Sequence, residues 1–150
     1  MPYHLERTLV IPRPRAEVFA LFANAENLER ITPPFLHFQI LTPPPIRIHA
    51  GATIDYQLTL FGIYFHWRTL IETFDPPSAF TDIQLTGPYR RWHHRHNFHE
   101  VPNGTEMHDQ VEYEIPFGPL GTLAHTLFIR RTVNRIFDHR NQTILKLLTA

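Results

Sequence analysis

The chain has 150 residues, and its 14 basic residues balance 14 acidic ones, so its formal net charge at pH 7 is zero. Zero net charge argues against a nucleic-acid partner, because such a partner is held by an excess of lysine and arginine. The absence of cysteine excludes disulfides and thiolate metal sites and is typical of a reducing compartment. Since no apolar run suits a signal peptide or a transmembrane segment, we expect one cytoplasmic domain over residues 1–150, whose oligomeric state stays open.

The first third of the chain predicts two strands separated by two short helices. Apolar and polar side chains alternate from Tyr3 to Ile11, which is typical of a half-buried strand. The apolar spacing predicts one short helix from Ala16 to Phe22 and another that runs from an N-cap at Asn24 to Ile31. A second strand is expected from Phe35 to Leu41, before a run of prolines.

Strands then follow one another, which predicts an antiparallel sheet. Alternation indicates strands over Ala52 to Leu60, Ile63 to Phe74 and Ala79 to Leu85. A two-residue turn between the first two of these strands would place Leu60 opposite Ile63, with Tyr56 and Trp67 on the same apolar side.

The stretch from Tyr89 to Ile115 predicts a hairpin around Asn103-Gly104, a strong turn signal. If these two residues form the turn, one face of the hairpin is polar and faces water. In that register Phe98 lies opposite Asp109. The face that turns inward combines aromatic and apolar side chains with two imidazoles, a phenol and a carboxylate: Trp92, His94, His96, Phe98, Asp109, Val111, Tyr113 and Ile115.

A long C-terminal helix is predicted from Pro119 to Leu148, where no further proline occurs. Leu120, Leu123 and Leu127 share one stripe of this helix, and the apolar side chains after them are centred on a rotated face. A long helix with a rotating apolar face is expected to be gripped by a curved sheet. We therefore expect the leucine stripe to face the sheet.

The polar groups on the inner face need partners, because a buried unpaired hydroxyl or amide costs about 1–3 kcal/mol. They either bond to one another in a filled core, for example His94 with Tyr113, or they line a cavity for an apolar ligand. The candidate ligand-binding residues are the inward side chains of both hairpins and the leucine stripe: Tyr56, Trp67, Trp92, His94, His96, Phe98, Asp109, Val111, Tyr113, Leu120, Leu123 and Leu127.

Two stretches carry a resemblance to a known family. The first stretch runs from Leu28 to Ile40. The second and more specific one runs from Arg91 to Gly121 and contains W-x-H-x-H followed by G-T-x-M-x-D-x-V-x-Y-x-x-P-x-G-x-L-G. Both stretches resemble the SRPBCC (Bet v 1/START-like) superfamily. The resemblance is to bacterial members described as ligand-binding, polyketide cyclase/dehydrase-like or coenzyme-Q-binding-like. It implies an α+β helix-grip fold, in which a curved antiparallel sheet of about seven strands wraps a long C-terminal helix and two short helices separate strands 1 and 2. It also implies a cavity for a hydrophobic small molecule, such as a lipid, an isoprenoid quinone or a polyketide.

Binding and catalysis are both compatible with these residues. A cyclase or dehydratase would use His94 or His96 to move a proton, Tyr113 to hold an enolate oxygen and Asp109 to orient an imidazole. The resemblance supplies no short catalytic motif, so binding is the first interpretation. A zinc site needs a third protein ligand, and Asp109 faces Phe98 in the predicted register, so we expect neither a metal nor a cofactor.

The C-terminal helix is locally basic, with Arg130, Arg131, Arg135, Arg140 and Lys146 against Asp138. A solvated helix face is the first interpretation of these charges. The alternative is a transient contact with anionic lipid headgroups during ligand delivery.

Overall fold

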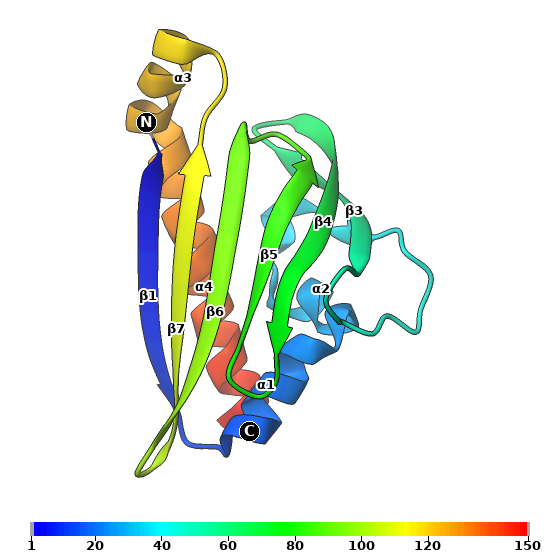
Figure 1. Ribbon diagram of the computed structural model, residues 1–150. Coiled ribbons are helices and arrows are strands. Elements are labelled where there is room, and N and C mark those ends of the chain that lie inside the picture. Colours follow the sequence, from blue (N-terminus) through cyan, green and yellow to red (C-terminus); the bar gives the residue numbers. More distant parts are fainter. Residues whose placement is uncertain (1, 150) are drawn as a thin grey trace.

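The computed structural model describes residues 2–149, and it has the helix-grip architecture. Among these residues, seven strands form one antiparallel sheet in the order β1-β7-β6-β5-β4-β3-β2. The sheet curves around the C-terminal helix, and the short helices lie between the first and second strands (Figure 1). The predicted α+β fold is therefore confirmed.

The strands are β1 (Tyr3–Ile11), β2 (Gln39–Ile40), β3 (Thr53–Leu60), β4 (Ile63–Asp75), β5 (Ala79–Thr86), β6 (Arg91–Val101) and β7 (Gly104–Glu114). The helices are α1 (Arg15–Ala23), α2 (Leu28–Ile31), α3 (Gly118–Ala124) and α4 (Arg130–Thr149), with 3₁₀ turns at Ala25–Asn27 and Pro34–Leu36 and a π-helical turn at His125–Ile129. Only the predicted second strand is much shorter than expected. Its first half forms a 3₁₀ turn that ends at His37 in the left-handed conformation, with φ of 48°, and this interrupts an extended chain.

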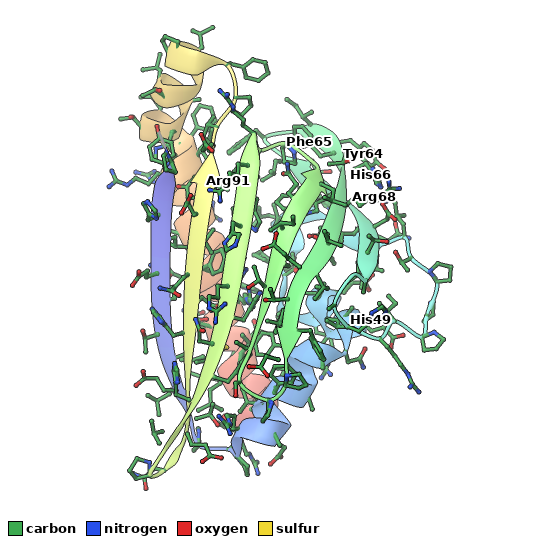
Figure 2. The ribbon with its side chains drawn as sticks, in the orientation of Figure 1. His49, Tyr64, Phe65, His66, Arg68 and Arg91 are labelled. Atoms are coloured by element: carbon green, nitrogen blue, oxygen red, sulfur yellow. The ribbon has the colours of Figure 1, made fainter. Side chains whose placement is uncertain are left out.

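The β3–β4 hairpin has the predicted register, in which Leu60 pairs with Ile63 and Tyr56 with Trp67. Its two turn residues both have positive φ, 52° at Phe61 and 76° at Gly62, as a two-residue hairpin turn requires. The residues between the inward ones lie on the outer face of the sheet, where His66 and Arg68 each donate to Asp55 over 2.9 Å (Figure 2).

The β6–β7 hairpin differs from the predicted register by two residues. Val101 pairs with Gly104, so the turn consists of Pro102 and Asn103 and not of Asn103 and Gly104. Gly104 instead begins β7 with φ of 148°, where an added Cβ would lie 2.0 Å from the carbonyl oxygen of Ile11. A shift of two residues keeps each side chain on its predicted face but changes its partner.

The new partners bring the ionisable side chains together. Asp109 lies opposite His96, and the predicted pairing of Asp109 with Phe98 is wrong. Met107 takes the place opposite Phe98, in a core that α1, β6, β7 and the end of α4 share.

The C-terminal helix packs on the sheet through its second half. Val133, Phe137 and Ile144 of α4 are buried against β1, β6, β7 and α1. The prediction for the first half is wrong, because this part of the helix projects past the end of the sheet (Figure 1). Its leucine stripe is therefore exposed to solvent, at 74% for Leu120, 56% for Leu123 and 65% for Leu127.

Replacing a large side chain with alanine should affect the free energy of unfolding differently in the two halves of the helix. We expect Ile144→Ala to lower the free energy of unfolding by about 2–5 kcal/mol, because it removes a fully buried side chain from the core. The matched change Leu123→Ala, on the exposed stripe, should alter it by less than about 0.5 kcal/mol. Urea unfolding followed by circular dichroism measures both values, and equal losses in the two variants would contradict this account of the helix.

Candidate functional site

A cavity of about 170 Å³ lies between the curved sheet and the α2–α4 side of the molecule. It is comparable in size with the cavity of about 150 Å³ in an engineered protein that accommodates benzene. Aromatic and aliphatic side chains dominate its walls: Phe22, Leu36, Phe38, Ile54, Tyr56, Leu58, Trp67, Tyr89, Trp92, Ile136 and Phe137. An enclosure with this lining suits a small and largely apolar molecule.

Five of the predicted binding residues line this cavity: Tyr56, Trp67, Trp92, His94 and His96. The other predicted residues lie elsewhere. Phe98 is packed in the core with α1, Asp109 lies behind the two histidines, and Val111 and Tyr113 are covered by α4. Leu120, Leu123 and Leu127 do not line the cavity, since they are on the exposed part of the helix. The cavity is thus displaced from β7 toward β3, β4 and β5.

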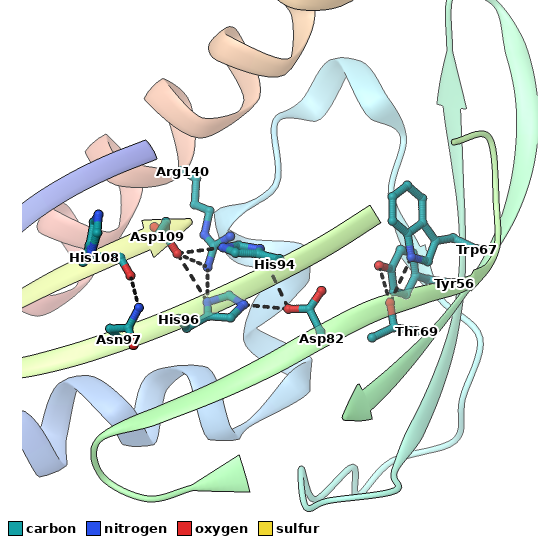
Figure 3. Close-up of polar contacts among 10 residues, drawn as sticks. All are labelled: Tyr56, Trp67, Thr69, Asp82, His94, His96, Asn97, His108, Asp109 and Arg140. Atoms are coloured by element: carbon teal, nitrogen blue, oxygen red, sulfur yellow. Dashed lines mark hydrogen bonds and ion pairs between the residues drawn. The ribbon is translucent and has the colours of Figure 1, made fainter. Parts of the chain in front are cut away.

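One wall of the cavity is polar, and it is built from two imidazoles between two carboxylates (Figure 3). His94 Nε2 donates to Asp109 Oδ1 over 2.8 Å, and His96 Nε2 donates to Asp82 Oδ2 over 2.6 Å. The second nitrogen of each ring points the other way: His94 Nδ1 lies 3.8 Å from Asp82 Oδ2, and His96 Nδ1 lies 3.4 Å from Asp109 Oδ1. The two rings stack with their centroids 3.6 Å apart.

Arg140 of α4 lies against this cluster, on the side opposite the sheet. Its Nη2 lies 3.3 Å from His96 Nδ1 and 3.9 Å from Asp109 Oδ1, and its guanidinium packs on the rings of Phe22 and Phe137. Asp109 has no exposed surface, so its carboxylate depends on this cation for charge compensation.

The charges of the cluster follow from these contacts. Burial raises the pKa of Asp109, but Arg140 and the His94 hydrogen bond outweigh burial and hold that pKa well below its usual range. Burial lowers the pKa of His96 to about 4. His96 is therefore neutral at pH 7, with its proton on Nε2 toward Asp82 and its Nδ1 accepting from Arg140.

A second polar group lies on the β3–β4 wall. Trp67 Nε1 donates to Thr69 Oγ1 over 2.9 Å, and the hydroxyl of Tyr56 lies 2.9 Å from the same oxygen. Burial raises the pKa of Tyr56, so this phenol stays protonated and can donate to a ligand.

The suggested bond between His94 and Tyr113 is not made. The Tyr113 hydroxyl instead lies 2.7 Å from Nε2 of His125, at the start of the π-helical turn, and Tyr3 stacks on the same imidazole with centroids 3.5 Å apart. This contact ties β1 and β7 to the helix, and Tyr113 does not line the cavity.

Sequence reasoning missed Asp82 and Arg140 as members of the site. Asp82 alternates with Phe80 along β5, so the inward position of Phe80 would have indicated an inward carboxylate. Arg140 occupies the helical stripe of Val133, Phe137 and Ile144, which marks it as a buried charge instead of a solvated one.

Comparison with known proteins agrees with this fold. A family model described as "Polyketide cyclase / dehydrase and lipid transport" matches residues 11–139. No curated protein shows significant sequence similarity to the chain.

Three solved structures illustrate the likeness. The Zhui aromatase/cyclase from Streptomyces sp. R1128 superimposes with a TM-score of 0.79 at 14% identity, over 99% of this chain and 94% of that one. Ara h 8.0201 superimposes with a TM-score of 0.66 at 14% identity, over 97% and 99%. A nucleoside-diphosphate sugar epimerase from Corynebacterium glutamicum matches 95% of this chain at 26% identity and a TM-score of 0.67, but over 28% of its own longer chain.

The molecule is thus a helix-grip protein with a largely apolar cavity between the sheet and the helices. The chain belongs to the polyketide cyclase/dehydrase and lipid transport family of the SRPBCC superfamily. Over residues 2–149, none of the helices combines the length and the apolar character that crossing a membrane requires.

Proposed function

We propose that this protein binds a hydrophobic small molecule, such as a lipid, an isoprenoid quinone or a polyketide, in the cavity between the sheet and α4. The observation that carries the proposal is a cavity with mostly apolar walls, in which most of the polar side chains gather in two groups, Asp82 with His94, His96 and Arg140, and Tyr56 with Thr69. Such a cavity buries an apolar body and fixes its orientation through a few hydrogen bonds. The family description and the aromatase/cyclase neighbour support the same ligand class.

The two polar groups would select different atoms of the ligand. Asp82 is a partly exposed carboxylate on the cavity wall, so it accepts a hydrogen bond from a ligand hydroxyl. Tyr56, on the β3–β4 wall, has a hydroxyl that can donate to a ligand carbonyl. A molecule with an apolar ring system and an oxygen at each end therefore fits the site best.

Filling the cavity should weaken ligand binding. We expect Ile136→Trp to weaken the binding of 1-naphthol, a neutral aromatic alcohol used here as a probe, by at least tenfold, or about 1.4 kcal/mol, because Ile136 of α4 lines the cavity. The matched change Gln142→Trp adds the same ring to an exposed position of α4 and should leave the affinity unchanged. Isothermal titration calorimetry measures both, and equal affinities would contradict the cavity as the binding site.

Native mass spectrometry followed by organic extraction identifies the natural ligand class. We expect a defined apolar compound to co-purify with the unaltered protein and with the Gln142→Trp variant, and to be missing from the Ile136→Trp variant.

A cyclase or dehydratase is the second candidate, because Asp109 orients His94. With Nε2–H held on Asp109, the lone pair of Nδ1 is left as a base within the cavity wall. It would take a proton from a carbon between two carbonyl groups. The resulting enolate carbon would then bond to a ketone carbon, and the alkoxide formed would receive the proton back from His94. Tyr56 lines the cavity where Tyr113 does not, so it would hold the enolate oxygen.

Replacing both imidazoles separates binding from catalysis. We expect the double variant His94→Gln, His96→Gln to keep its affinity for 1-naphthol within about tenfold, or 1.4 kcal/mol. If the protein is an enzyme, the same variant should lose all conversion of a poly-β-ketone, measured by the absorbance of the aromatic product. Loss of affinity and turnover together would assign the histidines a binding or structural role.

We also propose that the exposed end of the helix contacts anionic membranes when the ligand is exchanged. Phe117, Leu120, Leu123, Leu127 and Phe128, together with Phe61 from the β3–β4 turn, form an exposed apolar tip. The Phe61 and Phe128 rings meet with centroids 4.8 Å apart, and Phe61 follows Leu60, which lines the cavity. Residues 115–137 contain three arginines and no acidic residue, so the tip suits a negatively charged lipid surface.

Vesicle co-sedimentation tests this contact. At low salt we expect binding to vesicles of equal phosphatidylcholine and phosphatidylglycerol but not to phosphatidylcholine alone. The triple change Leu120→Ser, Leu123→Ser, Leu127→Ser should reduce binding at least tenfold, whereas Val10→Ser, at an exposed apolar position at the far end of β1, should not. Binding that does not depend on the anionic lipid would remove the membrane proposal.

A further inference from the structure

We propose that Asp82, His94 and His96 form a binding site for a divalent transition-metal ion on the polar wall of the cavity. One ligand atom from each of these residues lies within 4.8 Å of the other two. Two imidazoles and one carboxylate are a donor set that zinc and non-haem iron accept, with positions left open for a further ligand. This assignment does not depend on which apolar molecule the cavity holds.

No metal was expected from the sequence because the predicted register offered no third protein ligand, and Asp82 of β5 supplies one. Asp82 Oδ2 lies 2.6 Å from His96 Nε2 and 3.8 Å from His94 Nδ1. Metal–donor distances of about 2.0–2.1 Å place neighbouring donors of a tetrahedral site about 3.3 Å apart. The first gap therefore has to open by about 0.7 Å and the second to close by about 0.5 Å. The two imidazole donors lie within 4.8 Å of each other.

Asp109 is placed as the orienting carboxylate behind both ligands. Its Oδ1 lies 2.8 Å from His94 Nε2 and 3.4 Å from His96 Nδ1, the ring nitrogens that point away from Asp82. Metal-binding histidines usually donate their second N–H to a carboxylate, which fixes the ring and its tautomer. Here one buried carboxylate, that of Asp109, is in position to accept a hydrogen bond from both rings.

Arg140 would have to change its hydrogen-bond partner when a metal binds, and two buried atoms without partners offer a new pairing. His96 must move its proton from Nε2 to Nδ1 to bind a metal, and Arg140 then loses its acceptor on Nδ1. Within residues 2–149, Asp109 Oδ2 and Arg140 Nε are buried atoms without a hydrogen-bond partner. A small shift of the guanidinium would pair these two groups while Asp109 Oδ1 accepts from the imidazoles.

The site opens toward the ligand. Asp82, His94 and His96 all line the cavity, so the remaining coordination positions face the bound molecule and would accept one of its oxygens. A metal on Nδ1 occupies the lone pair that the cyclase mechanism needs, so the metal site and a His94 base exclude each other in one molecule.

Cobalt binding tests the site without any assay of activity. Chelator-treated protein is titrated with Co²⁺ and then Zn²⁺, followed by visible absorption and calorimetry. We expect one ion per chain, and a loss of at least 100-fold in affinity in Asp82→Asn and in His96→Gln. Asp109→Asn replaces the orienting carboxylate and also removes the charge that balances Arg140, and the variant should lose about 10–100-fold in affinity once circular dichroism has verified its fold. The matched control His66→Gln removes an imidazole from the similar His66–Asp55 pair on the outer face and should bind like the unaltered protein.

X-ray absorption of the zinc-loaded, unaltered protein provides a test that does not depend on the folding of a variant. We expect two imidazole nitrogens at about 2.0–2.1 Å from the zinc. A shell without imidazole, a stoichiometry well below one ion per chain, or equal affinities in His66→Gln and His96→Gln would each overturn the proposal.

Discussion

The buried charge of Asp109 is the constraint on which the interior of this protein depends. The carboxylate has no exposed surface, and a buried charge without a partner is strongly destabilising, by about 3–5 kcal/mol where one member of a buried pair is removed. Its compensation comes from Arg140 on α4, and its hydrogen bond from His94 on β6. Because these partners lie on different elements, the charge can be satisfied only when the helix sits at one rotation and one height on the sheet. Apolar packing on its own would tolerate several arrangements.

The same network explains why the cavity lies where it does. The polar cluster occupies the middle of the sheet, and Phe80 stacks on His96 with centroids 4.0 Å apart. On one side of it, Phe98 and Met107 fill the space beneath α1 and the end of α4. On the other side the sheet curves away, and large rings meet edge to face, as Trp67 does with Trp92. Aromatic walls held in this way enclose space that the helix side chains do not fill.

The sequence predicted the periodic features of the fold and the pairing of β3 with β4, but not the residue pairs of β6 and β7. Alternation assigned each strand residue to a face, and this survived the two-residue error in the β6–β7 turn, because a shift of two leaves the faces unchanged. The partners changed, and with them the chemistry, since Asp109 moved from Phe98 to His96. Asp82 reaches the site only through the pairing of β5 with β6, which no local pattern specifies. Arg140 was predicted to face solvent because its side chain is charged, although its position in the helix lies on the buried stripe.

The leucine stripe lies on the part of the helix that projects past the sheet, and the π-helical turn at His125–Ile129 separates this part from α4. One extra residue in a turn rotates all the side chains that follow by about 100° relative to those before it. The rotation of the apolar face along the helix, visible in the sequence, therefore marks a change of partner and not a continuous contact with the sheet. His125 fixes this change, because its imidazole is held by Tyr113 and Tyr3. The turn separates an anchored half, which carries Ile136, Phe137 and Arg140 to the cavity, from a half that presents its apolar side chains to the surroundings. A helix divided in this way can contact a partner at one end without disturbing the buried charge pair at the other.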